Sequence, residues 1–322
     1  MRAIVQDRYG LPDVLELREV DIPVVGDDYV LVRVHASSVN ALDWHLVTGL
    51  PYLARLEAGL RKPKRMIRGA DVSGRVEAVG GNVTQFRPGD EVFGDIGRGA
   101  YAEYACAPER AFVLKPPGLT FEEAAAVPVA ALTALQGLRD LGHIQPGQKA
   151  LINGASGGVG TFAVQIAKSL GTEVTAVCRT RNLDTARSIG ADHVIDYTQE
   201  DFTRRGERYD LMFDVPGNRR LADCWRVLQP EGTYLLVGGP KRRFLGPVPR
   251  LLRAKLGSLV RSRRVAWFIA RMKQEDLNYL SELLESGHVI PVIEETYPLE
   301  QTPDALRYFG EGHARAKIVI TV

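Results

Sequence analysis

Cysteine is scarce in this chain, and its spacing excludes two classes of protein. The three cysteines, Cys106, Cys178 and Cys224, lie far apart and include no C-x-x-C pair, so they form neither a disulfide framework nor a cysteine-built zinc site. No run of about 18 uninterrupted apolar residues is present. Met1 leads directly into the strand-like RAIVQD, without the apolar segment of a secretory signal. We therefore expect a protein of the reducing cytoplasm that neither spans a membrane nor is exported.

Acidic residues are absent from one segment, residues 241–264, which holds nine Lys/Arg although the whole 322-residue chain has a formal net charge of only +2. Its apolar residues recur at near-helical spacing, which favours a basic amphipathic helix; they are Val248, Leu251, Leu252, Leu256, Leu259 and Val260. One interpretation is a lid or dimer-facing helix that packs its leucines on the protein. The alternatives are weak contact with an anionic membrane surface, or weak nucleic-acid binding, which we do not expect.

Regular helical sequence is rare before residue 121, where short β segments are broken by Gly and Pro. Beyond it, strands and helices alternate, which predicts a doubly wound parallel sheet covered by helices. The expected strands are 149–153, 173–178, 193–196, 209–215, 233–239 and 264–270. The last fifty residues add a helix at 274–287 and a terminal strand at 316–322, which we expect to return to the first domain. The predicted parts are thus 1–121, 122–270 and 271–322.

The segment KALINGASGGVGTFAVQIAKSLG, residues 149–171, has the order strand, tight turn, helix. The helix presents one apolar face, made of Val159, Phe162, Ala163, Ile166, Ala167 and Leu170. Free N–H groups and the positive end of the helix dipole favour a pyrophosphate at such a turn, and Gly157, Gly158 and Gly160 allow close approach of the backbone. The fingerprint is A-x-G-x-x-G, with Ala155 in the first glycine position.

About twenty residues beyond these glycines, an NAD enzyme carries Asp or Glu to bind the adenosine ribose. This chain has Cys178-Arg179-Thr180-Arg181-Asn182 at that place. Two guanidinium groups and a hydroxyl can bind a 2′-phosphate, and the segment holds no carboxylate to reject it. The sequence therefore predicts NADPH as the cofactor. The alternative interpretation is that Arg179 and Arg181 are solvated residues at the start of a helix.

Four segments occur in the order GADVSGRVEAVGGNVTQFRPGDEVFG, GASGGVG, GADHVIDY and GHARAKIVITV. Together they resemble the zinc-independent quinone oxidoreductase family of the medium-chain dehydrogenase/reductases. The HAR before the last strand and PYLARLEAGLRKPKR are similar to the reticulon-4-interacting-protein-like branch. The resemblance implies an α/β fold in which a GroES-like, β-rich catalytic domain, made from both chain ends, surrounds a Rossmann domain. It also implies a homodimer.

The zinc ligands of alcohol dehydrogenases in this superfamily are missing. Asn40 stands in the segment that matches their catalytic cysteine, and Ala70-Asp71 in the segment that matches a His-Glu pair. The four clustered cysteines of a structural zinc lobe are also absent, so we predict no metal site. Without a Lewis acid, the easier reaction is hydride addition to an electron-poor acceptor, a quinone or an α,β-unsaturated carbonyl. The alternatives are an NADP(H)-dependent alcohol dehydrogenase or carbonyl reductase, and a weakly catalytic NADPH-binding protein.

The resemblance also implies roles for single residues. Asn40, Asp43 and Tyr52 would line the substrate cleft, and His45 has a pKa range suited to proton transfer. Each has a plainer alternative: Asn40 as a cap, Asp43 as the start of a helix, Tyr52 as a packed ring and His45 as a solvated or hydrogen-bonded side chain. For the dinucleotide the resemblance implies Thr133, Ser156, Gly158, Val159, Tyr197, Gly238, Gly239, His313 and Arg315, in addition to Gly157, Arg179, Thr180 and Arg181.

Overall fold

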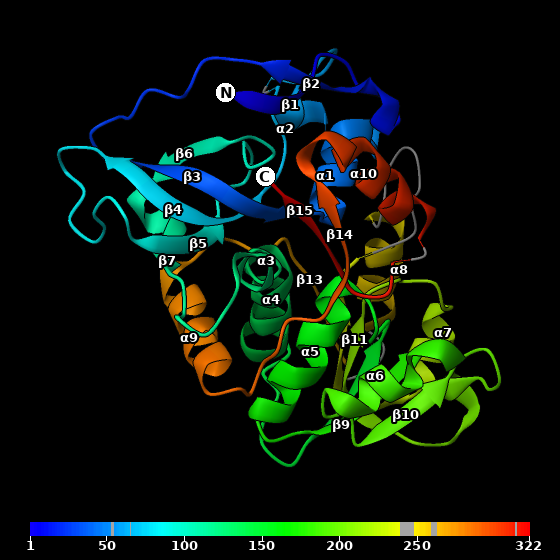
Figure 1. The fold of residues 1–322 in the computed structure, drawn as a ribbon. Helices are drawn as coiled ribbons and strands as arrows, with labels where there is room; N and C mark the ends of the chain where they lie inside the picture. The colour runs from blue at the N-terminus through cyan, green and yellow to red at the C-terminus, as the bar shows by residue number, and fades with distance from the viewer. Residues whose placement is uncertain (53–54, 65, 239–247, 259–262, 313) are drawn as a thin grey trace. The chain divides into compact units, whose positions relative to one another are not determined.

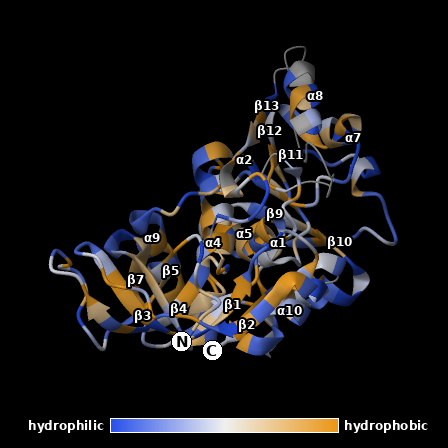
Figure 2. Ribbon diagram, turned by 90° about the horizontal axis from the view of Figure 1, so that it is seen from above, coloured by the Kyte–Doolittle hydropathy of each residue, from blue (hydrophilic) through white to orange (hydrophobic). Residues whose placement is uncertain are grey.

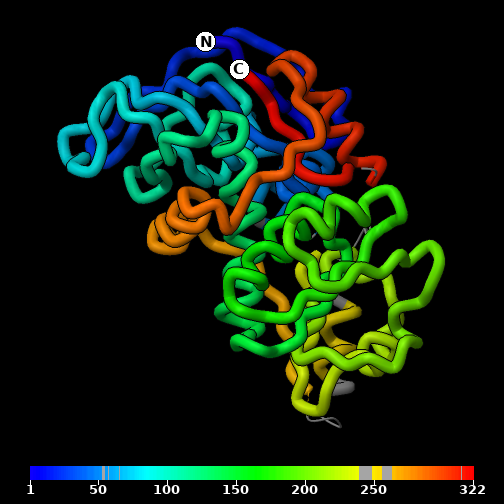
Figure 3. Tube along the Cα trace, turned by 60° about the horizontal axis from the view of Figure 1, so that its bottom comes forward, coloured from blue at the N-terminus to red at the C-terminus, as the bar shows by residue number. Residues whose placement is uncertain are grey.

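Both ends of the chain belong to one of the two units into which the molecule divides (Figures 1 and 3). Unit 1 comprises Met1–Leu132, Met272–Ser286 and Pro291–Val322, and unit 2 comprises Thr133–Arg271 and Gly287–Ile290. The structure is a computed structural model that describes residues 1–52, 55–64, 66–238, 248–258, 263–312 and 314–322. The first boundary lies at Leu132, whereas the sequence suggested residue 121.

The later boundary is explained by helix α3 (Phe121–Ala125), which is part of the core of unit 1. Ala125 and the following Ala126 are fully buried in a cluster with Ala36 and Val319. Helix α4 (Pro128–Leu135) then carries the chain into unit 2. Alanines allow α3 to lie close to the sheet of unit 1. Helical sequence therefore begins at residue 121, before the chain passes into unit 2 at Thr133.

A seven-stranded sheet forms the body of unit 1, in the order β14-β15-β3-β4-β5-β7, with β6 paired to β3. Its strands are β3 (Tyr29–Ser38), β4 (Asp71–Val79), β5 (Glu91–Asp95), β6 (Tyr104–Pro108), β7 (Phe112–Leu114), β14 (Ile293–Pro298) and β15 (Lys317–Thr321). The C-terminal strand β15 is antiparallel to β3, with Val319 opposite Ser38. Strands β1 (Arg2–Gln6) and β2 (Leu15–Glu19) form a separate antiparallel pair.

The valines of β3 form part of the core of unit 1. Val30, Val32 and Val34 are buried at every second position, and they pack in one cluster with Val72 and Phe112. Figure 2 shows the apolar residues that run along β3 and β4. Besides α3, the described helices of unit 1 include α1 (Ala41–Thr48), α2 (Arg55–Ala58), α9 (Gln274–Glu285) and α10 (Thr302–Glu311).

Unit 2 contains a six-stranded parallel sheet in the order β10-β9-β8-β11-β12-β13, which is 3-2-1-4-5-6 in chain order. Its strands are β8 (Lys149–Asn153), β9 (Glu173–Cys178), β10 (His193–Asp196), β11 (Tyr209–Asp214), β12 (Leu228–Leu236) and β13 (Arg264–Trp267). This is the strand order of a dinucleotide-binding Rossmann sheet. The predicted doubly wound fold is confirmed, and the first three strands match their predicted bounds residue for residue.

The helices of unit 2 are α5 (Gly158–Ser169), α6 (Leu183–Ser188), α7 (Leu221–Arg226) and α8 (Val248–Ser258). Helix α5 is buried on all sides from Gly160 to Ala167, not only on the predicted apolar face. Its buried Gln165 is satisfied by the backbone of Ile290, with bonds of 3.0 and 2.8 Å. Within the described ranges, no helix has the length and apolar character needed to cross a membrane.

Candidate dinucleotide and substrate site

The glycine turn joins β8 to α5 at the carboxyl edge of the parallel sheet. Gly154 has φ +85°, and a Cβ on Gly160 would lie 2.1 Å from the Gly154 carbonyl oxygen, so no larger residue fits at Gly160. A Cβ on Gly157 would meet nothing nearer than 3.6 Å, which leaves the outer side of the turn open. The first N–H groups of α5 have no partner within the helix. The turn therefore fits the pyrophosphate of a dinucleotide.

Asn182 connects this turn to the end of β9, and sequence reasoning gave it no role. The residue is 7% exposed, and its side-chain amide donates a 2.9 Å hydrogen bond to the Ser156 hydroxyl. This bond fixes the Ser156 hydroxyl at the glycine turn, and a role of Ser156 at the pyrophosphate stays a prediction. The available sequence signal was a polar residue directly after Arg179-Thr180-Arg181.

Arg179 and Tyr197, predicted separately, are brought together by the structure. The Arg179 Nε donates a 2.8 Å hydrogen bond to the Tyr197 hydroxyl, and Tyr197 is 40% exposed. Arg179, Thr180 and Arg181 are all exposed at the end of β9. Arg179 directly follows the buried Cys178 and is the N-cap of a short 3₁₀ turn, Thr180–Asn182, in which Thr180 and Arg181 lie.

A carboxylate also lies at this edge, contrary to the sequence interpretation. Strands β9 and β10 are parallel and place Asp196 opposite Cys178, where Asp196 accepts a hydrogen bond from the Thr180 hydroxyl. That bond holds the pKa of Asp196 below its usual range. The segment 178–182 contains no acidic residue, but strand β10 places Asp196 beside it, and the Thr180 hydroxyl donates a hydrogen bond to that carboxylate. Two guanidinium groups and one carboxylate thus share this edge.

The remaining cofactor predictions fall in different places. A Cβ on Gly238 would lie 2.3 Å from the Val215 carbonyl oxygen, so the chain after β12 lies directly against the chain after β11. Thr133 is half-buried in α4, at the first position of unit 2. Arg315, in unit 1, pairs with Glu294 through its backbone N–H and its guanidinium. Gly239 and His313 lie outside the described residues.

Asn40 belongs to a buried polar cluster in unit 1 that is centred on Asp71. The Asp71 side chain is fully buried and its Oδ2 accepts hydrogen bonds from Ser38, from the Asn40 amide (2.8 Å) and from the Lys317 ammonium (3.2 Å). Its Oδ1 accepts from the Val129 N–H at 2.9 Å. The Asn40 side-chain oxygen accepts a 2.8 Å bond from Lys317. Lys317, on the terminal strand, was absent from the predicted site, because its partners are distant in sequence.

Asp43 is also fully buried, so in this structure it offers no surface to a substrate. Its Oδ2 accepts a 2.9 Å bond from the Asn40 N–H and its Oδ1 a 3.2 Å bond from the Gly69 N–H. Burial raises the pKa of Asp43 to about 6, and the nearby charge of Asp71 adds to the effect. These contacts agree with the alternative interpretation, in which Asn40 and Asp43 begin helix α1.

Tyr52 and His45 differ from Asn40 and Asp43 because they keep exposed surface. Tyr52 is 37% exposed, and the Arg55 guanidinium lies 4.8 Å from its ring centre. His45 is half-buried, and its Nδ1 lies 2.6 Å from the Leu50 carbonyl oxygen. Because a carbonyl only accepts, Nδ1 carries the proton in this bond.

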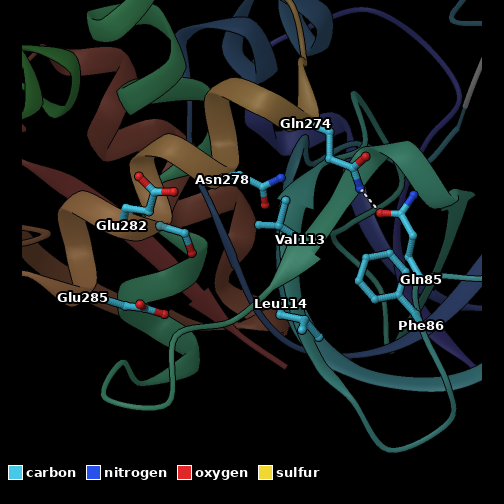
Figure 4. Close-up of a pocket in the computed structure, with 9 residues that line it drawn as sticks. Gln85, Phe86, Val113, Leu114, Gln274, Asn278, Glu282 and Glu285 are labelled. Carbon is cyan, nitrogen blue, oxygen red and sulfur yellow. Dashed lines mark hydrogen bonds between the residues drawn. The ribbon is translucent and has the colours of Figure 1, made fainter.

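The described residues contain no group of three or more His, Cys, Asp or Glu arranged to hold a metal ion. A pocket in unit 1 lies between α9 and β7, and none of the predicted site residues that the structure describes lines it. Figure 4 shows Gln274 of α9 and Gln85 pointing toward each other there, with a 2.8 Å hydrogen bond between their side chains.

Comparisons with known proteins cover both units. Residues 26–117 match the family model for an alcohol dehydrogenase GroES-like domain, and residues 189–320 match that for a zinc-binding dehydrogenase. The chloroplastic quinone-oxidoreductase QR1 of Triphysaria versicolor is 36% identical over 99% of this chain and 98% of its own. The mitochondrial NAD(P)H oxidoreductase RTN4IP1 of Mus musculus is 32% identical over 100% and 89%.

Among solved structures, the quinone oxidoreductase of Coxiella burnetii superposes with a TM-score of 0.88 at 30% identity. The match covers 100% of this chain and 99% of that one. The predicted GroES-like part and Rossmann sheet are thereby confirmed, as is the resemblance read from the four sequence segments.

Proposed function

The chain belongs to the quinone oxidoreductase family of the medium-chain dehydrogenase/reductases, and from this premise we propose that it transfers a hydride from NADPH to a quinone or an α,β-unsaturated carbonyl compound. The observation that carries the proposal is the glycine turn at the N-terminus of α5, on the carboxyl edge of a 3-2-1-4-5-6 sheet. That edge is where such sheets bind dinucleotides.

NADPH supplies the hydride when it is bound. The chain would supply binding and orientation: the N–H groups at the start of α5 would hold the pyrophosphate, and Gly157 leaves room beside the turn. Ser156, fixed by Asn182 at 2.9 Å, adds a hydroxyl at the same place. Orientation of hydride donor and acceptor accounts for much of the rate in such a reaction.

The preference for NADPH over NADH is the finer part of the proposal. Arg179 and Arg181 are exposed where the adenosine ribose is bound in this fold, and guanidinium groups bind a phosphate dianion through charge-assisted hydrogen bonds. Tyr197 orients Arg179 through its hydroxyl. Asp196 weakens the local positive potential, but its bond from Thr180 turns it toward that hydroxyl.

Reduction of a quinone or an enone also needs a proton at the acceptor. We assign its donation to the segment that carries His45 and Tyr52, since Asp43 and Asn40 of the same segment are buried in the Asp71 cluster. The substitutions His45→Gln and Tyr52→Phe separate the two donors. The variant that lacks the donor should lose kcat and the pH dependence of kcat, while its KM for NADPH should stay unchanged.

The experiment that tests the proposal is NADPH oxidation with 9,10-phenanthrenequinone and with a simple enone, each with and without a zinc chelator. We expect turnover with at least one acceptor and no effect of the chelator. Chelator-sensitive oxidation of simple alcohols without quinone or enone turnover would replace the proposal by the alcohol dehydrogenase alternative. Tight NADPH binding without turnover on either acceptor would favour the weakly catalytic alternative.

We further propose a cytoplasmic homodimer that makes weak contact with an anionic membrane surface through helix α8. Leu251 and Ala254 of this helix face the core of unit 2, whereas Leu252 is 60% exposed and is flanked by the exposed Arg253. Flotation with anionic vesicles at low salt tests the contact, and its absence would refute it. Sedimentation equilibrium gives the oligomeric state.

A further inference from the structure

A buried carboxylate lies at the carboxyl end of β11, directly beside the glycine turn. The Asp214 side chain has no exposed surface. Its Oδ1 accepts a 2.8 Å bond from the Asn153 amide and a 3.1 Å bond from the Gly217 N–H. Its Oδ2 accepts a 2.7 Å bond from the Tyr234 hydroxyl and a 3.4 Å bond from Arg250 Nη2. Three strands and helix α8 thus meet at this one carboxylate.

Arg250 contributes a positive charge from the basic segment 241–264. Its side chain is 15% exposed, and its Nε and Nη2 donate bonds of 2.9 and 2.7 Å to the Tyr234 hydroxyl. That hydroxyl in turn donates to Asp214. Nη1 donates to the Arg219 carbonyl. The guanidinium therefore compensates Asp214 both directly and through Tyr234, and it fixes α8 to the sheet.

The loop that follows Asp214 lies against two parts of the dinucleotide site. Asn153, bonded to Asp214, is the residue before Gly154, and a Cβ on Gly154 would lie 3.0 Å from Pro216 and 3.3 Å from Val215. The Val215 carbonyl also lies against Gly238. Strands β8 and β11, which flank this point, are those at which the strand order reverses. A shift of the Asp214 side chain would therefore be passed through Asn153 and Val215 to the backbone of the glycine turn and of Gly238.

A buried carboxylate that loses its cation is costly, and the structure around it rearranges to reduce that cost. We propose that Arg250 is a positioning residue for the dinucleotide site, and that docking of α8 through Arg250 and binding of the dinucleotide stabilise each other. The proposal rests on the dinucleotide binding assigned above. It gives the basic segment a role within unit 2, in the cofactor affinity of the protein.

The test compares Arg250→Met with Arg253→Met, which removes an exposed arginine of the same helix. The Kd of NADPH is measured by isothermal titration calorimetry on the full chain. We expect about a tenfold increase for Arg250→Met, within the range of coupling between sites in proteins, and less than about twofold for Arg253→Met. KM for NADPH should rise with little change in kcat, and Arg250→Lys should be intermediate, because an ammonium keeps the charge but not the fork geometry.

Asp214→Asn separates positioning from general stabilisation. In that background the uncompensated charge is gone, so Arg250→Met should change the Kd of NADPH by less than about twofold. An unchanged Kd in folded Arg250→Met, or the same loss in the Asp214→Asn background, would overturn the proposal. The deciding readout is the Kd of NADPH, so a protein that binds NADPH but reduces neither a quinone nor an enone would refute the proposed function and leave this inference standing.

Hydrogen exchange on the unmodified protein provides a measurement that does not depend on the folding of a variant. If NADPH binding and docking of α8 stabilise each other, NADPH must slow hydrogen exchange of the amides in residues 250–255. The amides of strand β2 in unit 1 serve as the reference. Equal exchange of residues 250–255 with and without saturating NADPH would contradict the proposal.

Discussion

Replacing Lys317 by methionine removes a positive charge from the interior of unit 1 with little change in side-chain length. The Lys317 and Asp71 side chains are 2% and 0% exposed, and their charged atoms lie 3.2 Å apart. Breaking a buried pair by removing one partner typically costs about 3–5 kcal/mol, because the remaining charge is uncompensated. Asp71 keeps its bonds from Ser38, Asn40 and Val129, so we expect the lower end, about 3 kcal/mol.

This loss corresponds to a fall in Tm of about 6–12 °C for a domain of roughly 150–250 residues. The assay is thermal unfolding followed by circular dichroism, together with urea unfolding for the free energy. Arg75→Met is the matched control in the same sheet, because Arg75 and Glu91 are 55% and 36% exposed. Such a surface pair contributes at most about 1 kcal/mol.

A double-mutant cycle with Asp71→Asn completes this experiment. Once the carboxylate is replaced by a neutral amide, Lys317→Met should cost much less than it does in the unmodified protein. The reasoning is refuted if Lys317→Met is no more destabilising than Arg75→Met. It is refuted equally if the two substitutions at Asp71 and Lys317 are additive.

Three further predictions concern a carboxyl group, the arginines and the glycine turn. Burial raises the pKa of Asp95 to about 7. Between about pH 4 and pH 7 the native state therefore keeps a proton that the unfolded state has lost, and the free energy of unfolding falls as pH rises through that window. Asp95→Asn should raise Tm at pH 8 more than at pH 5, and an equal gain at both pH values would contradict this. The double substitution Arg179→Ala/Arg181→Ala should raise KM for NADPH by about tenfold or more, since a hydrogen bond to a charged group is worth about 1.5–3 kcal/mol. KM for NADH should stay nearly unchanged. An equal rise in KM for both dinucleotides would show that the arginines have a structural role. Gly160→Ala places a Cβ 2.1 Å from a carbonyl oxygen and should lower Tm, whereas Gly157→Ala should keep Tm and weaken NADPH binding by calorimetry; a neutral Gly160→Ala would refute the packing argument.

The parallel sheet of unit 2 could be predicted from the sequence because its signals are local. A buried parallel strand is a short apolar run between turns, and Lys149–Asn153 is followed at once by the glycine turn and an apolar helix. Strand β7 (Phe112–Leu114) could not be found in this way. Three residues are too few to show a period, and they are held in the sheet by pairing with β5.

The parts of the site that sequence reasoning missed depend on contacts between distant residues. Lys317 lies 246 positions from Asp71, and they meet because β15 joins the edge of β3, which pairs with β4. Asp196 reaches the arginine segment only because β10 lies parallel to β9 in that register. The sequence does not distinguish Arg250 from the other eight basic residues of its segment, whereas helix α8 places it against Asp214. Local sequence patterns therefore predict which secondary-structure element a residue belongs to, whereas the order and register of the strands determine which distant residues it contacts.

The ratio of kcat/KM for NADPH to that for NADH, with 9,10-phenanthrenequinone as the acceptor, is the most direct test of the proposed hydride transfer. It reports the reaction, the acceptor class and the role of Arg179 and Arg181 in one assay. We expect quinone-dependent oxidation of NADPH and a ratio of about 10 or more, because a guanidinium bound to the 2′-phosphate has no counterpart in NADH. A ratio of 1 or below, or no quinone-dependent oxidation of either dinucleotide, would contradict it.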